Sequence, residues 1–424
     1  MAAQNGRPHL RYNAHMEQQK KKVLVFIPTF PVLSETFIER DVAKLAERNV
    51  VDVSILSLNR GKGAASDSLN DKVFYQPLSW LNSLKAIKYF FTKPGKIIDT
   101  WTFLGSSPRG FISKLYLFLK SIGYVEVFAK HRPDFILAHF MSEPSTLCLI
   151  VSEILEIPLG IFGHAKDITV DAEYVPQKVE KAKFILVCNK NALKHAILLS
   201  GKPNPKNMIL QYHGIDFEKL RAQFEAAEPI GFKEKDAPVI TMVGRLVEKK
   251  GHKYLLQASK ILKEKGVVHQ LVLIGPGPMF EEINTLIERM NLQDTVQIIG
   301  EGKGIPFSEI LRYYKSTDVC VFSGIRTDSG DEDGLPNTLT EAAVLRVPIV
   351  TTKVGSTTDL VENEVSGLVV PQKDPGALAA ALERTITDSD LREKITAGAE
   401  KKVREIFALD KNIQELERMI GASF

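Results

Sequence analysis

The residues best suited to chemistry in this sequence lie in one stretch, residues 331–351 (DEDGLPNTLTEAAVLRVPIVT). Pro336 has the fixed φ of a first helical position, so we expect a helix over 336–345 and then a short buried strand over 347–351. A helix N-terminus is electropositive and carries unpaired N–H groups. The turn at 333–336 is therefore suited to bind an anion such as a phosphate.

Two acidic residues flank this turn. Asp333 precedes the expected helix and Glu341 lies within it, on the order of 10 Å away if most of the intervening residues are helical. Gly334 lets a ligand approach the backbone closely because it has no side chain. This spacing suits a ligand with a diphosphate between a ribose and a second sugar, each held by one acid. The alternative interpretation is a helix with an acidic start and a solvated glutamate.

The same stretch resembles the acid, seven residues, acid motif of the retaining glycosyltransferases of family 4. The motif runs from Asp333 to Glu341, and the similarity continues through Val354-Gly355 and through residues 364–371 (EVSGLVVP). One position departs from the family, which usually has Glu in place of Asp333. The side chain of Asp333 reaches about 1.5 Å less, the length of one C–C bond.

The resemblance implies roles for individual residues. Glu341 would hold the ribose of a nucleotide diphosphate sugar and Asp333 its sugar, while backbone N–H groups of the turn would serve the sugar and the phosphates. The expected donor-binding residues are Gly244, Gly275, Glu301, Gly334, Leu335, Pro336, Asn337 and Glu341.

Residues 242–251 (MVGRLVEKKG) look like the family's strand, Gly-Arg turn and Lys-Gly pair at the head of a helix. Cleavage of a sugar–diphosphate bond places negative charge on the leaving phosphate, and fixed cations stabilise that charge most in the transition state. Arg245 can bind phosphate oxygens as a fork, and Lys250 can act as a point charge. We rank the adjacent Lys249 below Lys250. Ordinary surface cations are the alternative.

Two glycine turns follow in the same half of the chain. Residues 273–278 (LIGPGP) form an incomplete dinucleotide fingerprint, since Phe280 replaces the third glycine. We interpret this turn, with Gly275, as a wall of a nucleotide pocket. By resemblance, the strand ending at Gly300-Glu301 borders the nucleobase, whose identity the sequence does not give.

In the first half, residues 31–38 (PVLSETFI) stand where many family members have a Gly-Gly loop. The segment is similar to the version found in branches that build exopolysaccharides. We expect Ser34 to cap a helix over 35–47 and Ser34, Glu35 and Thr36 to lie on the acceptor side of the site.

Histidines follow several expected strands. His164 comes after a strand ending at Phe162, and the resemblance places it against the transferred sugar near the reaction centre. A histidine at a strand end is also often structural. We place His139 behind His164, and we give residues 213–216 (HGID), similar to the family's interdomain turn, a structural role.

We expect no metal. Asp331-Glu332-Asp333 spells an Asp-x-Asp of the kind that binds a divalent cation in another glycosyltransferase fold, but it precedes a helix whose partner cations are already Arg245 and Lys250. The three cysteines, Cys148, Cys188 and Cys320, have neither metal-ligand nor disulfide spacing. We interpret them as core thiols in a reducing compartment.

The composition is that of a soluble globular protein of two or three domains, with 424 residues, 44% hydrophobic and 25% charged. Residues 1–22 are polar, without the apolar core of a signal peptide, and no apolar run approaches a membrane span. We therefore expect a cytoplasmic protein.

Charge is unevenly placed along the chain. Residues 80–130 contain eight basic and two acidic residues, interleaved with aromatic and leucine side chains. Such a segment favours peripheral contact with an anionic membrane surface. A pair of core helices with a solvated basic face is the alternative. Nucleic acid is disfavoured because no known binding module accompanies the basic residues.

Strand-sized apolar runs alternate with helical patterns, restart after residue 238, and predict two doubly wound parallel sheets that face a central cleft. The resemblance implies the same α/β architecture, GT-B. The expected divisions are a polar tail at 1–22, an acceptor-side Rossmann-like domain at 23–227, a linker at 228–238, a nucleotide-sugar domain at 239–408, and a C-terminal helix at 409–424 that crosses back to the first domain.

We therefore expect a metal-independent, retaining glycosyltransferase that needs no cofactor. Its donor would be a UDP- or GDP-linked hexose, with UDP favoured, and its acceptor a lipid-linked or growing saccharide. The residues expected to carry catalysis are Arg245, Lys250, His164 and Asp333. Alternatives on the same scaffold are a nucleotide-sugar epimerase or hydrolase and a non-catalytic nucleotide-sugar sensor. The incomplete glycine pattern disfavours a nicotinamide dehydrogenase.

Overall fold

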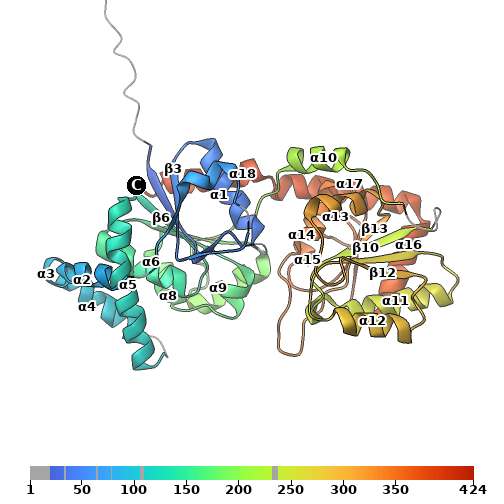
Figure 1. Ribbon diagram of the computed structural model, residues 1–424, viewed down its shortest axis with the longest axis horizontal. Coiled ribbons are helices and arrows are strands. Elements are labelled where there is room, and N and C mark those ends of the chain that lie inside the picture. Colours follow the sequence, from blue (N-terminus) through green and yellow to red (C-terminus); the bar gives the residue numbers. More distant parts are fainter. Residues whose placement is uncertain (1–19, 33–34, 64, 78, 106–108, 232–236) are drawn as a thin grey trace, which may run out of the picture.

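The computed structural model describes residues 20–32, 35–63, 65–77, 79–105, 109–231 and 237–424. Ser34 and most of the expected N-terminal tail lie outside these ranges. The described chain forms two α/β domains side by side (Figure 1). Both are parallel sheets with helices on both faces, so the predicted fold class is confirmed.

The N-terminal sheet has its first strand near the middle. In spatial order its strands are β5 (Val73–Tyr75), β3 (Asp52–Ser57), β1 (Lys22–Phe26), β6 (Phe135–His139), β7 (Leu159–Gly163), β8 (Phe184–Val187) and β9 (Met208–Leu210). The short strands β2 (Thr29–Phe30) and β4 (Asn59–Arg60) pair beside it. Alternate residues of β1 enter different cores, Leu24 on one face and Val23 on the other. The strands are therefore apolar on both sides, as parallel strands between helices must be.

The C-terminal sheet repeats this order. Its strands are β12 (Val296–Ile299), β11 (Gln270–Ile274), β10 (Val239–Val243), β13 (Val319–Phe322), β14 (Ile349–Thr352) and β15 (Leu368–Val370). After β10 the chain adds β11 and β12 on one side of it, and then crosses to the other side to add β13, β14 and β15. The point where the direction reverses, between β10 and β13, is where ligands bind in sheets of this kind.

The helices cover both faces of each sheet (Figure 1). Those of the N-terminal domain are α1 (Thr36–Arg48), η1 (Asp67–Lys72), α2 (Trp80–Ala86), α3 (Lys88–Thr92), α4 (Pro94–Gly105), α5 (Phe111–His131), α6 (Glu143–Leu155), α7 (Ala165–Thr169), α8 (Val175–Lys181) and α9 (Lys190–Ser200). The later helices are α10 (Phe217–Ala226), η2 (Glu248–Lys250), α11 (His252–Glu264), α12 (Phe280–Arg289), α13 (Phe307–Lys315), α14 (Asn337–Val344), α15 (Thr357–Leu360), α16 (Pro375–Thr387), α17 (Ser389–Ile406) and α18 (Leu409–Gly421).

The chain crosses between domains earlier than the sequence predicts. Helix α10 belongs to the C-terminal domain, because Leu220 is part of that domain's core. Ile230, in the expected linker at 228–238, also packs against this core and donates its N–H to Ser316 Oγ at 2.9 Å. The first crossing therefore lies near Ile215, before the boundary predicted at 227/228. The amphipathic pattern of α10 does not reveal which of two similar cores it covers.

A second crossing runs beside the first. Ile215 donates its N–H to the carbonyl of Phe407 at 2.7 Å and accepts from Leu409 N–H at 3.2 Å. A Cβ at Gly214 would lie 2.4 Å from Leu409 Cα, so this close pairing requires glycine. The two domains are thus joined by two paired strands of chain, which restrict their relative motion.

Helix α18 lies on the N-terminal domain (Figure 1). Its apolar face, including Ile413 and Leu416, is part of the core between α1 and the N-terminal sheet. Arg48 on α1 forms an ion pair with Glu417 at 3.0 Å. The last helix of the chain therefore completes the first domain.

We predict that Ile413→Ala lowers the free energy of unfolding of the N-terminal domain by about 2–5 kcal/mol, because the substitution leaves a cavity in a closed core. Ile413 is 1% exposed. Both tryptophans of the chain, Trp80 and Trp101, lie in this domain, so urea denaturation followed by tryptophan fluorescence reports on it. The exposed neighbour Gln414→Ala is the control. An unchanged midpoint for Ile413→Ala would contradict the proposed packing of α18.

Candidate active site

The carboxyl ends of both sheets supply the residues of one interdomain site. A cavity of about 150 Å³ lies between the domains. Its lining from the N-terminal domain is Phe37, Arg40, His164, Ala165, Cys188, Asn189 and His213, and from the later chain Gly334, Leu335, Asn337, Thr340 and Phe407. Of the residues predicted from sequence, the structure brings His164 together with the turn at 333–337.

An ion pair joins the two chemical motifs of the C-terminal domain. Lys250 Nζ lies 2.7 Å from Asp333 Oδ2 and 5.0 Å from the centre of the Phe322 ring. Lys250 is buried at the end of η2, directly after the loop that follows β10. Lys249 also approaches Asp333, at 3.5 Å, and pairs with Asp331 at 3.0 Å. Both lysines therefore place positive charge beside the acid.

Close backbone packing fixes the turn that contains Asp333. A Cβ at Gly355 would lie 1.8 Å from the Asp333 carbonyl oxygen, and Gly355 has a φ of +53°. The next residue, Ser356, donates its N–H to the Gly334 carbonyl at 2.9 Å. Gly355 therefore lets the loop after β14 hold this turn against the start of α14.

Helix α14 begins one residue later than predicted. Pro336 is the N-cap, with an extended ψ of 130°, and Asn337 is the first helical residue. Proline's fixed φ suits either position, so the sequence did not distinguish them. The following strand likewise begins at Ile349 rather than at residue 347. The turn at 333–336 still precedes a helix, and Gly334, Leu335 and Asn337 at this junction line the interdomain cavity.

Gly334 has a second neighbour that the sequence did not reveal. A Cβ there would lie 2.9 Å from Asn189 Nδ2 and 3.0 Å from Ala165 Cβ, both in the N-terminal domain. The domains also meet at the start of α9, where Lys190 N–H donates to Asp359 Oδ2 at 2.9 Å. Ser356 Oγ donates to Asn189 Oδ1 at 2.9 Å. The absence of a side chain at Gly334 allows this close approach of the domains.

Glu341 lies behind the anion-binding turn. Tyr314 O–H donates to Glu341 Oε2 at 3.3 Å. Burial raises the pKa of Glu341 to about 7, while the Arg40 guanidinium on α1 and the Tyr314 hydrogen bond oppose that rise. Arg40, which the sequence analysis missed, thus faces the second acid of the motif from the other domain.

The remaining predicted donor residues line the edge of the C-terminal sheet. A Cβ on Gly244 would meet Lys250 Cε at 3.4 Å, and one on Gly275 would lie 2.0 Å from the Gly244 carbonyl oxygen. The side chain of Arg245 is exposed, with no ion pair to any described acid. Glu301 is also exposed, in a turn with a φ of +47°. The structure thus places Lys250, Gly244 and Asp333 together and leaves Arg245 and Glu301 pointing into solvent.

Three histidines form a hydrogen-bonded row on the N-terminal side. Asp41 Oδ2 lies 2.6 Å from His213 Nδ1, His213 Nε2 lies 3.0 Å from His164 Nδ1, and His164 Nε2 lies 3.2 Å from His139 Nδ1. The three rings stack at centroid distances of 5.5 and 5.0 Å. His139, His164 and His213 follow β6, β7 and β9, whose carboxyl ends share one sheet edge.

The row has a direction. Burial lowers the pKa of His139 to about 3 and holds that of His164 well below its usual value, so both rings are neutral. With His139 and His164 neutral, Asp41 Oδ2 accepts from His213 Nδ1–H, His213 Nε2 accepts from His164 Nδ1–H, and His164 Nε2 accepts from His139 Nδ1–H. His213 therefore has a polar role that the sequence analysis did not assign. The sequence analysis noted histidines after several expected strands but did not predict that three of them bond to one another.

Cys188 is not the core thiol that the sequence predicts. It follows β8 directly, is partly exposed, and lines the interdomain cavity, whereas Cys148 and Cys320 are buried. Burial among protein groups raises the pKa of the Cys188 thiol to about 12, and Asn189 Nδ2 lies 3.4 Å from the sulfur. The cluster of His164, Cys188 and His213 has no counterpart in sequence spacing because each residue comes from a different strand.

The expected acceptor side is described in part. Glu35 is the N-cap of α1 and Thr36, its first residue, is exposed. Burial raises the pKa of Glu35. The ring of Phe37, next in the chain, packs against His213 at 4.4 Å. The start of α1 thus borders the histidine row, with Ser34 outside the described residues.

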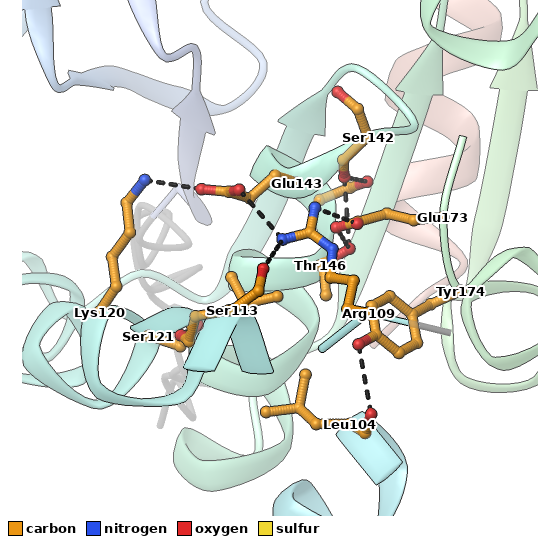
Figure 2. A network of polar contacts seen from close by, with 12 residues as sticks. Leu104, Arg109, Ser113, Lys120, Ser121, Ser142, Glu143, Thr146, Glu173 and Tyr174 are labelled. Carbon is orange, nitrogen blue, oxygen red and sulfur yellow. Dashed lines mark hydrogen bonds and ion pairs between the residues drawn. The ribbon is translucent and has the colours of Figure 1, made fainter. Parts of the chain in front are cut away.

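The basic segment at 80–130 is less basic than its sequence suggests. Figure 2 shows Arg109 between Glu143 and Glu173, with Lys120 also bound to Glu143. Ion pairs also hold Lys88, to Glu126, and Lys93 and Lys96, to Glu156. Five of the eight cations therefore have acidic partners, three of which lie beyond residue 130.

Comparison with known proteins identifies the family. Residues 223–402 match the family model described as Glycosyl transferases group 1. This segment of the chain, which holds most of the C-terminal domain, is similar to the group 1 glycosyl transferases. The resemblance found in the sequence is therefore confirmed at the level of the family. The matched segment contains Lys250, Asp333 and Glu341.

One relative matches nearly the whole chain, and another matches about half of it. A Salmonella typhimurium protein provisionally named as a colanic acid biosynthesis glycosyltransferase is 27% identical over 417 residues, 95% of this chain and 98% of the relative. A capsular polysaccharide biosynthesis glycosyltransferase of Staphylococcus aureus is 32% identical over 244 residues, 55% of this chain and 60% of the relative.

Several solved structures share the fold of this chain. A glycosyltransferase from Rickettsia africae matches with a TM-score of 0.69 at 15% identity, covering 94% of this chain and 98% of the other. Anabaena HepE, solved in complex with UDP and glucose, matches with a TM-score of 0.64 at 17% identity, covering 95% and 100%. These likenesses confirm the GT-B architecture.

We predict that Glu341 makes folding depend on pH. Because its pKa is raised from 4.5 to about 7, the folded protein binds a proton that the unfolded chain releases between these values. Its stabilisation is complete below pH 4.5 and is lost as the pH rises through 7, by about 3 kcal/mol. Relative to Glu341→Gln, the wild type should lose stability between pH 5 and pH 8.

Urea denaturation followed by circular dichroism measures this difference. The exposed Glu264→Gln serves as the control and should follow the wild type at both pH values. Parallel curves for the wild type and Glu341→Gln would show that Glu341 is ionised in the folded protein at pH 5.

Proposed function

We propose that this glycosyltransferase transfers a hexose from a nucleotide diphosphate sugar, with retention at the anomeric carbon and without a catalytic metal. The observation that carries the proposal is the Lys250–Asp333 ion pair beside the N-terminus of α14. A lysine, a helix N-terminus and an acid that can accept hydrogen bonds from sugar hydroxyls therefore lie next to one another. This combination suits the two halves of a sugar phosphate.

In this proposal the donor spans the cleft. Its phosphates lie between Lys250 and the N–H groups at Leu335 and Asn337. The long side chain of Arg245 is exposed and can reach them. Asp333 holds the sugar and Glu341 the ribose. Pockets that enclose whole ligands of this size occupy about 300–1,000 Å³. The cavity of about 150 Å³ therefore suits the sugar, with the nucleotide extending along β10 and β11.

The proposed retention follows from the charges around the sugar. A retaining enzyme that uses a covalent intermediate needs a free carboxylate as nucleophile. The Asp333 carboxylate already has two ammonium partners. We infer front-face attack, in which the leaving phosphate helps to take the acceptor proton. His164, neutral and turned toward the cavity, would border the reacting carbon.

We propose UDP as the nucleotide and a lipid-linked or growing saccharide as the acceptor. The UDP complex of HepE supports the nucleotide, through a shared fold. The names of the Salmonella and Staphylococcus relatives support a role in building an extracellular polysaccharide. The acceptor would enter from the N-terminal domain, past the start of α1.

The proposed membrane contact would use apolar rather than charged groups. More than half of the large apolar side chains found exposed in the described chain lie in the segment 80–131 that holds α2–α5, among them Phe91 and Ile112 at 81% and 82% exposure. These helices lie at the end of the molecule away from the C-terminal domain (Figure 1). Within the described ranges, no helix has both the length and the hydropathy needed to cross a bilayer.

We predict that Lys250→Ala or Arg245→Ala lowers kcat/KM by about 100-fold or more, because each removes a cation that stabilises the leaving diphosphate. The assay measures nucleotide diphosphate release from a panel of nucleotide sugars with and without saccharide acceptors. Lys253→Ala, an exposed cation on α11, is the control. Denaturation curves of each variant separate lost chemistry from lost folding.

The same assay distinguishes the alternatives. Sugar release without acceptor indicates a hydrolase, and tight nucleotide-sugar binding without turnover indicates a sensor. The anomeric configuration of the product, read by NMR, tests retention. Activity that survives both substitutions would exclude these cations from the mechanism.

We predict that the double variant Phe91→Ser, Ile112→Ser lowers the fraction of protein that floats with vesicles containing anionic lipid, because it removes apolar area that would enter the lipid. The matched control is Leu198→Ser, Val268→Ser, at 75% and 62% exposure outside α2–α5. Equal flotation of the two double variants would exclude this surface.

A further inference from the structure

Three potential metal ligands meet at the N-terminal wall of the cavity. His164 follows β7, Cys188 follows β8, and His213 lies shortly after β9. One ligand atom from each lies within 4.8 Å of the other two. The facing atoms of the histidines, His164 Nδ1 and His213 Nε2, are 3.0 Å apart. Two imidazole nitrogens and a sulfur are a donor set that suits zinc.

The distances are close to those that zinc requires. With Zn–N bonds of about 2.0–2.1 Å and a Zn–S bond of about 2.3 Å, tetrahedral angles place the two nitrogens about 3.3 Å apart and each nitrogen about 3.6 Å from the sulfur. The observed nitrogens need to separate by a few tenths of an ångström. The three ligand atoms lie within 4.8 Å of one another, so a nitrogen–sulfur distance needs to shorten by about 1.2 Å at most.

The second nitrogen of each histidine already has a partner. His213 Nδ1 is 2.6 Å from the Asp41 carboxylate, and His164 Nε2 is 3.2 Å from His139 Nδ1. Metal-binding histidines are typically oriented in this way, with a carboxylate or another acceptor on the far nitrogen. Asn189 Nδ2, 3.4 Å from the sulfur, can donate to a thiolate.

We propose that His164 Nδ1, His213 Nε2 and Cys188 Sγ form a zinc site whose fourth position faces the interdomain cavity. All three residues line this cavity, so a water molecule or an anionic ligand can complete the tetrahedron. Three protein ligands and one open position are the pattern of an accessible rather than a closed structural site.

Protons balance in the binding step. The Cys188 thiol loses its proton to solvent and forms a bond to zinc through sulfur. His213 keeps its hydrogen on Nδ1, toward Asp41. Zinc displaces the proton on His164 Nδ1, and His164 Nε2 takes the proton of His139 Nδ1. The displaced proton passes to His139 Nε2, the buried atom that has no hydrogen-bond partner among the described residues, so the Cys188 proton is the one released to solvent.

The consequence for the enzyme rests on the proposed function. Zinc at this site would occupy space beside the sugar and tie His164 to the wall of the cavity. The site would therefore make transfer sensitive to zinc, and chelators would restore it. Because the proposed reaction needs no metal, zinc here is an inhibitor.

Binding is tested first, without any activity measurement. Untagged, metal-free protein is titrated with Zn²⁺ by calorimetry and with Co²⁺ by absorption. We expect one tight site and a thiolate-to-cobalt charge-transfer band. Cys188→Ala should lose both. Cys148→Ala and Cys320→Ala, which remove thiols buried elsewhere, should keep both.

A second variant tests the orienting role of Asp41. Asp41→Asn should weaken zinc binding by about 10–100-fold while leaving the cobalt–sulfur band in place at saturation. If Cys188→Ala binds zinc as the wild type does, or if the wild type gives no cobalt–sulfur band, the proposal is wrong.

Inhibition is measured separately, as the ratio of rates with and without Zn²⁺ for each protein. The ratio should fall in the wild type and in Cys148→Ala but stay near one in Cys188→Ala. If the protein binds zinc at Cys188 but transfers no sugar under any condition, the proposed function fails and the zinc site stands. If zinc inhibits the wild type and Cys188→Ala equally, the inhibitory site lies elsewhere and the proposal is overturned.

Discussion

The ion pair between Lys250 and Asp333 is the contact on which the site depends. The lysine follows the loop after β10, and the acid lies in the turn before α14. Their ion pair therefore joins the segments on the two sides of the point where the strand order of the sheet reverses. A buried ammonium is costly without a counter-charge. A diphosphate that entered the cleft would share this cation and free the acid for sugar hydroxyls. The site is thus assembled before its anionic ligand arrives.

The opposite wall is built from uncharged rings. His139, His164 and His213 stack on Phe162 and are anchored at one end by Asp41. Because burial disfavours imidazolium, His139 and His164 stay neutral, and their hydrogens follow the orientation that Asp41 sets through His213. In the proposed function, the sugar lies against this wall and its phosphates lie against the cationic wall opposite. The same row, beside Cys188, gives the donor set that we propose for zinc.

Interdomain contacts hold these walls at a defined separation. The paired crossings at Ile215 and Ala408 tether the domains, and α18 returns to complete the N-terminal core. At the cleft itself, the first N–H groups of α9 bind Asp359 and Ser356 of the other domain. Gly334 lies in this contact, where any side chain would meet Asn189. The glycine of the motif therefore serves domain closure as well as ligand approach.

The sequence by itself determined the features that depend on local order along the chain. Alternation of apolar strands with helices gave two doubly wound sheets, and a proline after Asp-Gly-Leu marked the start of α14 to within one residue. The spacing of Asp333 and Glu341, and of Gly244 and Lys250, indicated the family. These signals are local because propensity, turn chemistry and motif spacing act within about ten residues.

Only the tertiary structure decided which distant residues meet. The spacing of Asp41, His139, His164, Cys188 and His213 does not predict a cluster, because parallel strands bring the last four, which are 24 or more positions apart, to one edge, and Asp41 comes from α1. The partners of the basic segment, and the assignment of α10 to the second domain, likewise depend on long-range packing. A periodic pattern shows that a face is buried but not what buries it.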